Sequence, residues 1–233
     1  YSRGCPFNCE FCDIIEMFGR KTRVKTAERF IREIDAVYDS GFRGNLFIVD
    51  DNFIGNKREV KKLLPKLAEW QQERGYPFKL STEASINLAQ DEQLLNMMVD
   101  SGFNMVFVGI ETPDQDTLAQ TQKSQNLRGS IIDDIKIIQS AGIEVTGGFI
   151  IGFDSDKDDI FERQLSFIQE AGIPTAMVGM LTALPNTQLY RRLEAENRLT
   201  EESSGNNTHL LNLNFLPKMP VQKIIAGYRN LLK

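Results

Sequence analysis

One local pattern recurs five times along the 233 residues. A segment with apolar residues at helical spacing ends in a glycine, and a short extended apolar segment follows. Glycine just past a helix adopts the left-handed conformation that closes the last turn without a Cβ clash. Helices that alternate with short apolar strands predict a parallel sheet covered by helices. The junctions are Gly41, Gly75, Gly102, Gly142 and Gly172, and strands are expected near 46–49, 78–81, 106–108, 145–151 and 176–184.

The number of junctions suggests how the sheet closes. A short strand that leads into the loop at Cys5 would raise the number of strands from five to six. Six βα units suggest an open, partial (β/α)6 barrel, although a doubly wound sheet obeys the same pattern. We expect residues 1–185 to form this barrel. Residues 186–233 are expected to form a C-terminal helical extension, with helices over 188–198 and 221–232.

All three cysteines of the chain lie within eight residues. Cys5, Cys9 and Cys12 have the spacing Cys-x3-Cys-x2-Cys. Three thiolates can hold three irons of a [4Fe–4S] cube. The fourth iron then has no protein sulfur and is open to another ligand. This pattern favours a cluster that takes part in chemistry over one that only stores an electron.

Three other uses of these cysteines compete with a cluster. An odd number of crowded cysteines argues against a disulfide framework and for a reducing compartment, hence the cytoplasm. Structural zinc needs a fourth ligand, and the only histidine, His209, lies in a polar stretch nearly the whole chain away. A catalytic thiol lacks a nearby histidine base. A non-catalytic zinc or electron-transfer module remains the alternative from another functional class.

Acidic residues follow several of the expected strands. Asp50 and Asp51 end the 46–49 strand, Glu83 ends the next one, and Glu111 ends the one after it. Ligands of parallel α/β folds bind at the carboxyl ends of the strands, so these acids should converge on the cysteine loop. Glu83 and Glu111 are charged residues on apolar strands, which is costly unless they are paired. A cationic ligand would supply that partner, whereas Asp154 suits a turn or helix cap.

Three glycines stand out in the segment 145–152. Gly147, Gly148 and Gly152 weaken packing inside a strand and suggest the close approach of a ligand or another backbone. Their spacing fits neither the P-loop nor the dinucleotide fingerprint. No catalytic residue can be assigned from the pattern.

Overall composition excludes some partners. With 41% hydrophobic and 25% charged residues the chain is typical of a soluble globular protein. A net charge of −5 disfavours nucleic acid as a partner, because such binding needs concentrated positive charge. No apolar run approaches the roughly 18 residues of a membrane span.

These motifs resemble the radical S-adenosylmethionine (SAM) superfamily. The cysteine motif with Phe11 before its last cysteine is that superfamily's hallmark. The resemblance covers nearly the whole chain. Within the superfamily, the chain resembles the cobalamin-dependent group with a C-terminal DUF4070 region, which includes hopanoid and bacteriochlorophyll methylases. The stretches that carry it are Ser2–Ile15, Val49–Asn56, Gly109–Pro113, Gly147–Asp154 and Leu181–Pro185.

The resemblance implies roles for the residues already singled out. The three cysteines would hold the [4Fe–4S] cluster, and SAM would chelate its open iron. Phe11 would lie beside the adenine, and the Asp50–Asp51 turn would meet the methionyl amino group. Glu111 would bind the ribose or the methionyl end of SAM. The glycines of 147–152 would support the adenosine, whereas Glu83 belongs to no motif that assigns it a contact.

The resemblance also implies an activity. We expect an enzyme that cleaves SAM to a 5′-deoxyadenosyl radical and C-methylates an unactivated carbon of a lipid-like or polycyclic substrate, using cobalamin. The cobalamin-binding domain that precedes the cysteines in this group is absent from this chain, so we expect the chain to be the catalytic-domain fragment of a longer protein. An electron donor such as flavodoxin or ferredoxin is expected. Other radical SAM chemistry, such as ring rearrangement or oxidation, is the alternative within the family.

Overall fold

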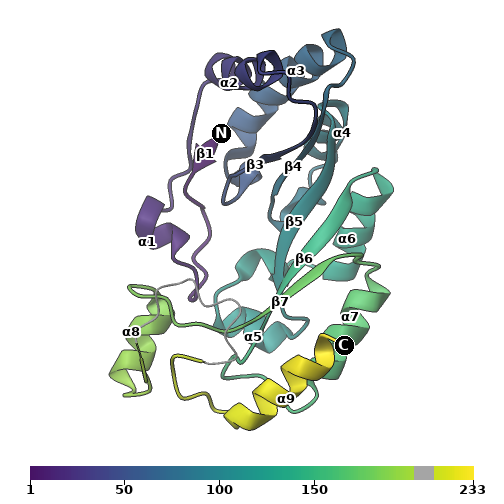
Figure 1. Cartoon of the computed structure of the whole chain (residues 1–233). Helices are drawn as coiled ribbons and strands as arrows, with labels where there is room; N and C mark the ends of the chain where they lie inside the picture. Colours follow the sequence, from purple (N-terminus) through teal and green to yellow (C-terminus); the bar gives the residue numbers. More distant parts are fainter. Residues whose placement is uncertain (202–212) are drawn as a thin grey trace.

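The computed structural model describes residues 1–201 and 213–233. A five-stranded parallel sheet, in the order β3-β4-β5-β6-β7, forms its centre. The sheet curls into a half-barrel with helices along its outer face (Figure 1). The partial barrel expected from the sequence is therefore confirmed. The strands are β3 Gly44–Ile48, β4 Phe78–Glu83, β5 Phe103–Glu111, β6 Glu144–Ile151 and β7 Ala176–Met180.

A helix precedes or follows each of these strands, as the glycine pattern predicts. All five junction glycines have positive φ, from 64° at Gly172 to 94° at Gly142. The Thr26 hydroxyl accepts a hydrogen bond from the Arg29 N–H and caps the first long helix. The helices of the barrel are α2 Ala27–Asp39, α3 Lys57–Glu73, α4 Glu92–Asp100, α5 Gln115–Gln120, α6 Ile131–Ser140 and α7 Ile160–Glu170. Three short 3-10 segments, 53–56, 86–88 and 124–127, lie in the loops.

The expected sixth parallel strand is wrong for the described residues. The strand before the cysteines, β1 (Ser2–Arg3), pairs antiparallel with β2 (Arg23–Val24) and does not join the sheet. The reason lies at the end of β3. The Asp50 carboxylate accepts hydrogen bonds from the Ser2 N–H at 2.8 Å and the Ser2 hydroxyl at 2.8 Å. A side chain thus takes the place of a backbone ladder between β1 and β3, and the short helix α1 (Ile14–Phe18) follows the cysteine loop.

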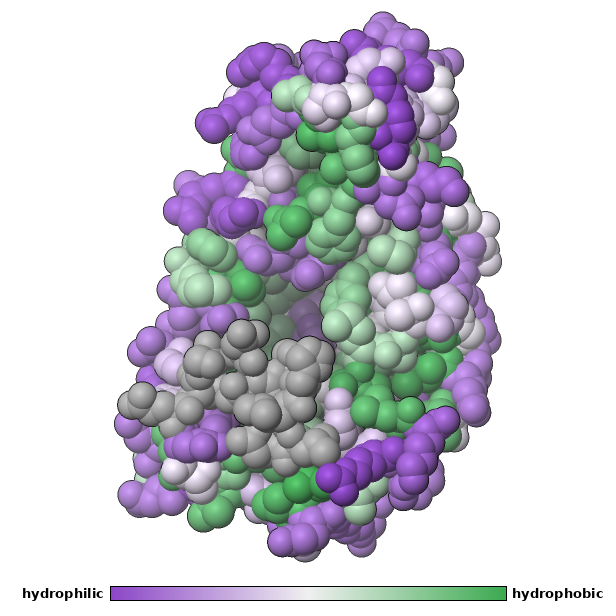
Figure 2. All heavy atoms as spheres, in the orientation of Figure 1, coloured by the Kyte–Doolittle hydropathy of each residue, from purple (hydrophilic) through white to green (hydrophobic). Residues whose placement is uncertain are grey.

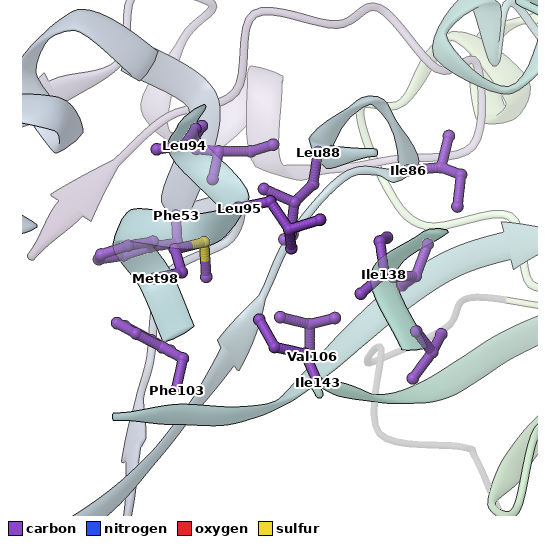
Figure 3. Close-up of a cluster of buried hydrophobic side chains, with 14 of the residues drawn as sticks. Phe53, Ile86, Leu88, Leu94, Leu95, Met98, Phe103, Val106, Ile138 and Ile143 are labelled. Carbon is purple, nitrogen blue, oxygen red and sulfur yellow. The ribbon is translucent and has the colours of Figure 1, made fainter. Parts of the chain in front are cut away.

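The main hydrophobic core fills the space between the sheet and its helices. Figure 3 shows α4 presenting Leu94, Leu95 and Met98 toward Phe103 and Val106 of β5. These five side chains are at most 3% exposed. A fully buried side chain of this size contributes about 1.5–3 kcal/mol through the hydrophobic effect. This core fixes the direction of the strands and therefore the place of their carboxyl ends.

A second hydrophobic cluster lies at the carboxyl end of β6 and β7. It joins Ile151 and Leu181 to the C-terminal segment, which contains α8 (Gln188–Ala195) and α9 (Val221–Leu231). Figure 1 shows α8 and α9 at the opposite end of the molecule from α2 and α3. Phe11 of the cysteine loop also packs against this cluster. No helix among the described residues is long and apolar enough to cross a bilayer.

Candidate functional site

The cysteine loop lines a cavity of about 300 Å³ at the carboxyl ends of the strands. Cys5, Cys9, Cys12 and Phe11 form one wall, and residues that follow β3, β4 and β5 form the other. Figure 2 shows this face of the molecule hollowed between the N-terminal segment and the sheet. Also lining the cavity are Phe7, Ile14, Asp51, Asn52, Glu83, Ala84, Ser85, Phe107, Gly109, Glu111, Lys123 and Gln125.

The three cysteines are free thiols with amide donors beside two of them. Gln125 Nε2 donates to Cys9 Sγ at 3.6 Å, and Asn52 Nδ2 donates to Cys5 Sγ at 3.8 Å. N–H donors to sulfur stabilise thiolates and tune the potential of an iron–sulfur cluster. The donor set of three sulfurs around one cavity, with N–H groups behind them, fits a [4Fe–4S] cube.

Burial opposes ionisation of two of these thiols, Cys9 and Cys12. It raises the pKa of Cys9, against the attraction of Lys123, and raises the pKa of Cys12 to about 12. Cluster binding must therefore displace protons. Within residues 1–201 and 213–233, no three Cys, His, Asp or Glu side chains are arranged around a single metal ion. A cube has a different requirement, because each thiolate binds its own iron. His209 lies outside the described residues.

Glu111 is paired with a lysine that the sequence did not single out. Lys123 Nζ lies 2.5 Å from Glu111 Oε1, and both side chains are about one-tenth exposed. Burial alone would lower the Lys123 pKa, but the Glu111 carboxylate outweighs it and holds that pKa above its usual value. A Cβ at Gly109 would come within 2.5 Å of Glu111 Oε1 and 2.9 Å of Lys123 Nζ. Gly109 therefore makes room for the pair.

The backbone at Glu111 supports the same arrangement. Glu111 has φ 67°, and the register of β5 against β6 shifts between Gly109 and Glu111. A non-glycine residue in this region costs about 1–2 kcal/mol. Such strain is characteristic of functional sites. The bulge directs the Glu111 carboxylate into the cavity, where the Lys123 ammonium also lies 5.7 Å from the centre of the Phe11 ring.

Glu83 faces the same cavity without a partner. No ion pair or hydrogen bond engages its half-buried carboxylate within the described part of the chain. Burial raises the pKa of Glu83, and the nearby Asp51 carboxylate raises it further, against a smaller opposing attraction from Lys123. Among the described residues, the Asp51 side chain accepts a single, long hydrogen bond, from the Gly4 N–H at 3.4 Å. These two carboxylates are therefore available to a cationic ligand.

Asp50 and the three glycines of the 145–152 segment do not line the cavity. Asp50 is 2% exposed, and its carboxylate is taken up by the backbone of residues 1 and 2. Gly148 makes room for the Phe107 ring, because a Cβ there would lie 2.7 Å from it. At Gly147 a Cβ would lie 2.8 Å from the Phe149 ring. Gly152, with φ 100°, turns the chain after β6. The close approach expected at 147 and 148 comes from aromatic rings of the protein.

Several residues of the cavity were not predicted. Lys123 and Gln125 come from the turns after α5, and Asn52 and Ser85 from loops after β3 and β4. Asn52 Nδ2 donates to the Ser85 hydroxyl at 3.1 Å, which fixes the amide beside Cys5. Nothing in the residues around them marks Lys123 or Gln125, because their positions depend on how the loops pack. For Asn52, its place directly after the Asp50–Asp51 pair was an available signal.

A second hollow lies on the concave face of the sheet. It has a volume of about 430 Å³ and is floored by Phe47, Met105 and Met177. Glu83 and Phe107 line both this hollow and the cysteine cavity. The two spaces are therefore neighbours, one polar and sulfur-lined, the other mainly apolar.

Comparison with known proteins places this geometry in a family. The model of the radical SAM superfamily matches residues 1–168, and that of DUF4070, a domain of unknown function, matches residues 187–233. A protein of Synechocystis described as an uncharacterized methyltransferase is 50% identical over 98% of this chain. The hopanoid C-2 methylase of Rhodopseudomonas palustris is 40% identical over 99%. The chain spans 42% of the length of each of these relatives.

Solved structures agree on the fold. The radical SAM methyltransferase TsrM from Kitasatospora setae, with cobalamin and a [4Fe–4S] cluster bound, matches with a TM-score of 0.74 at 13% identity. The match covers 88% of this chain and 37% of TsrM. The family match, the identity to the two relatives and the sulfur-lined cavity at the strand ends lead to one conclusion. The chain belongs to the radical SAM superfamily, with the [4Fe–4S] cluster and SAM as the cofactors of its barrel, and its C-terminal segment belongs to DUF4070.

Proposed function

We propose that this chain is the radical SAM part of a methyltransferase that adds a methyl group to an unactivated carbon. Cys5, Cys9 and Cys12 hold the cluster, and SAM occupies the cavity beside them. The observation that carries the proposal is the placement of three thiols and the unpartnered Glu83 carboxylate around one cavity at the strand ends. When bound, the cluster and SAM supply a 5′-deoxyadenosyl radical that abstracts hydrogen.

The chain's own residues bind and orient the cationic end of SAM. Glu83 accepts hydrogen bonds from the methionyl ammonium group. Asp51 lies close enough to Glu83 to attract the same ammonium charge. Charge-assisted hydrogen bonds of this kind contribute roughly 1.5–3 kcal/mol. Lys123 already neutralises Glu111. The pair therefore offers a Glu111 carboxylate oxygen to the ribose and the Lys123 ammonium group to an anionic group of the ligand. Phe11 and Phe107 supply apolar walls for the adenine and exclude water.

The apolar hollow next to the cavity suits the substrate. Its floor of Phe47, Met105 and Met177 favours a hydrocarbon surface, and it reaches the cavity at Glu83 and Phe107. Methionine side chains adapt to irregular apolar shapes. A lipid-like or polycyclic substrate is consistent with a 40% identical hopanoid C-2 methylase. Radical chemistry benefits from such a shielded site, because water and protein groups would otherwise quench the radical.

Cobalamin is proposed for the whole protein. The support is the likeness to TsrM, whose structure contains cobalamin, and to methylases more than twice as long as this chain. An electron donor such as flavodoxin or ferredoxin is proposed to reduce the cluster. Cysteine thiolates of this kind persist in a reducing compartment, so the cytoplasm is the proposed location.

Anaerobic reconstitution with iron and sulfide tests the core of this proposal. We expect a [4Fe–4S] EPR signal that changes when SAM is added, and 5′-deoxyadenosine among the products after reduction. Cys9→Ser should abolish the signal. One zinc ion per chain and no visible absorbance would contradict the proposal. A product mass increase of one methyl group separates methylation from rearrangement.

A further inference from the structure

Glu10 lies inside the cysteine motif, yet all its polar groups bind residues outside the loop. Its N–H donates to the Thr121 carbonyl at 2.9 Å, and its carbonyl accepts from the Leu189 N–H at 2.9 Å. Its carboxylate accepts from Arg192 Nε at 2.5 Å and from Arg192 Nη2 at 3.4 Å. Glu10 is 8% exposed. Two of these three anchors, Leu189 and Arg192, belong to the DUF4070 segment, residues 187–233.

Arg192 connects the loop to the end of β6. Its Nη1 donates to Asp154 Oδ2 at 2.9 Å. Asp154 also binds Arg198, through Nη2 at 2.5 Å, so two arginines of the DUF4070 segment share one carboxylate. These arginines hold the Asp154 pKa below its usual range in spite of burial. The turn or cap expected for Asp154 is therefore not its role. Asp156 takes it, by accepting hydrogen bonds from the Gly152 and Phe153 N–H groups.

Apolar packing joins the same two regions. Phe11, three residues before α1 begins, packs edge-on against Phe153, with the two ring centroids 5.8 Å apart. Phe11 also packs against the second hydrophobic cluster, to which α8 contributes Leu189 and Leu193. The cysteine loop has little secondary structure of its own, so its order must come from such contacts. The polar and apolar contacts together hold the middle of the motif between β6 and α8.

We propose that the DUF4070 segment fixes the cluster loop, with Arg192 as a positioning residue that immobilises and neutralises Glu10 between Cys9 and Cys12. This inference rests on the proposed function in one respect, that these cysteines hold the cluster. Its physical basis is that a buried carboxylate next to two cluster ligands is both a mechanical anchor and a negative charge. Arg192 controls both.

The reduction potential of the cluster in the reconstituted chain distinguishes this role of Arg192 from a purely mechanical stabilisation of the loop. A nearby negative charge disfavours the added electron and lowers the potential. Arg192→Met exposes the Glu10 charge, so the potential should fall. Glu10→Gln removes that charge, so the potential should rise. Loosening of the loop alone would shift both variants in the same direction. Lys223→Met is the matched control, since Lys223 lies in the same DUF4070 segment and pairs with the exposed Asp158, which is outside the cysteine loop.

Hydrogen exchange of the loop gives a readout that needs no cluster. Loss of a charge-assisted hydrogen bond should speed exchange of the Cys9–Cys12 amides about ten- to hundredfold in Arg192→Met. Arg192→Lys keeps the charge and loses the paired contact, so it should speed exchange while its potential stays near that of the wild type. It also serves if Arg192→Met fails to fold.

The signs of the potential shifts and the exchange rates of the loop decide the inference. Opposite potential shifts with an unchanged Lys223→Met support the inference, and shifts of the same sign, or none, overturn it. If the wild-type chain takes up no cluster, the proposed function fails, and exchange in the apo chain decides the inference alone. Faster loop exchange in Arg192→Met then supports the clamp, and unchanged exchange refutes it.

Discussion

The ends of β4 and β5 carry the same residue in two different states. Glu83 and Glu111 follow neighbouring strands and line one cavity. Glu111 is neutralised by Lys123 at 2.5 Å, whereas the half-buried Glu83 has no ion pair in the described residues. Both carboxylates satisfied the same sequence argument, that a charge on an apolar strand needs a partner. One partner is built into the protein, and we propose that the other is a ligand.

This difference indicates that the two carboxylates have different roles in the cavity. A carboxylate with an internal cation is held in place and keeps its charge, so it is suited to shape the site. A carboxylate without one carries a desolvation cost that a bound cation relieves. Glu83 should therefore contribute to ligand affinity and Glu111 to stability.

Removal of the cation at Glu111 should be the most damaging change. Lys123→Met leaves a buried carboxylate unpaired, which costs about 3–5 kcal/mol of the free energy of unfolding. Urea unfolding of the apo chain measures it. Lys123→Met with Glu111→Gln should recover much of the loss, because no buried charge remains. Lys223→Met, which breaks the exposed pair with Asp158, should cost less than about 1 kcal/mol. A loss of similar size in both lysine variants would contradict the assignment of Glu111 to stability.

A third acid, Asp156 after β6, extends the comparison to pH. Burial, offset only in part by the N–H groups of Gly152 and Phe153, raises its pKa to about 6. Because the folded chain then holds the proton more tightly than the unfolded chain, whose Asp pKa is about 3.9, the stabilisation is present at low pH. It is lost as pH rises from about 4 to about 6. Its size is about 3 kcal/mol at most.

Urea unfolding at a series of pH values checks this. Asp156→Asn should remove the corresponding fall in the free energy of unfolding between pH 4 and 6. Asp158→Asn, at an exposed neighbouring acid, should leave the fall in place. An unchanged pH profile in Asp156→Asn would show that this carboxyl titrates normally.

Loss of the unpartnered carboxylate should act on binding. Glu83→Gln should weaken SAM binding to the reconstituted chain about 10- to 100-fold, the effect of one charge-assisted hydrogen bond. The free energy of unfolding of the apo chain should not fall, because the variant removes an uncompensated charge. Glu144→Gln is the control, since Glu144 lines only the apolar hollow among the two spaces. Anaerobic calorimetric titration provides the affinities.

The raised pKa of Glu83 adds a pH signature to the same variant. As pH falls through that pKa, the carboxylate takes up a proton and loses its attraction for the methionyl ammonium group. Wild-type SAM affinity should therefore fall with pH from above the usual glutamate range. In Glu83→Gln this dependence should be absent, and its persistence would exclude Glu83 as the ammonium partner.

The smallest expected effect is a difference in SAM affinity between alanine variants of two adjacent glycines. A Cβ would crowd the Phe107 ring at Gly148 and the Phe149 ring at Gly147. Both alanine variants should lose about 1–3 kcal/mol of stability through overpacking. Only Gly148→Ala moves a ring that lines the cysteine cavity, where we propose that SAM binds. An off-rotamer ring costs about 0.5–1.5 kcal/mol, so SAM affinity should fall about two- to tenfold. Equal affinities in the two variants would argue against Phe107 as a wall of the site.

The parts of the site that the sequence predicted are those fixed by local patterns. The cysteine spacing, Phe11 within it, and the acids at the ends of β4 and β5 all reach one cavity. Asp50 was placed at the same rim, but its carboxylate turns toward β1. The side chains of successive strand residues point to opposite faces, and a run of two acids leaves open which one faces the ligand. Asp51 is the one that lines the cavity.

The sequence did not predict the contacts between residues that lie far apart in the chain. Lys123 neutralises Glu111 from 12 positions away, and Arg192 binds Glu10 across 182 positions. No periodicity or motif relates such pairs, because the folded backbone alone brings them together.

The sequence by itself determined the alternation of strands and helices, through apolar periodicity and the glycines that end the helices, and it determined the cluster motif. These features depend on neighbours a few residues apart, where backbone sterics and spacing decide the outcome. Tertiary structure decided that β1 stays outside the sheet, that Glu111 is paired with Lys123 while Glu83 has no ion pair in the described residues, and that Arg192 binds Glu10. Each of these results depends on burial. A charge removed from water must find a partner wherever the fold places one, however distant it is in the chain.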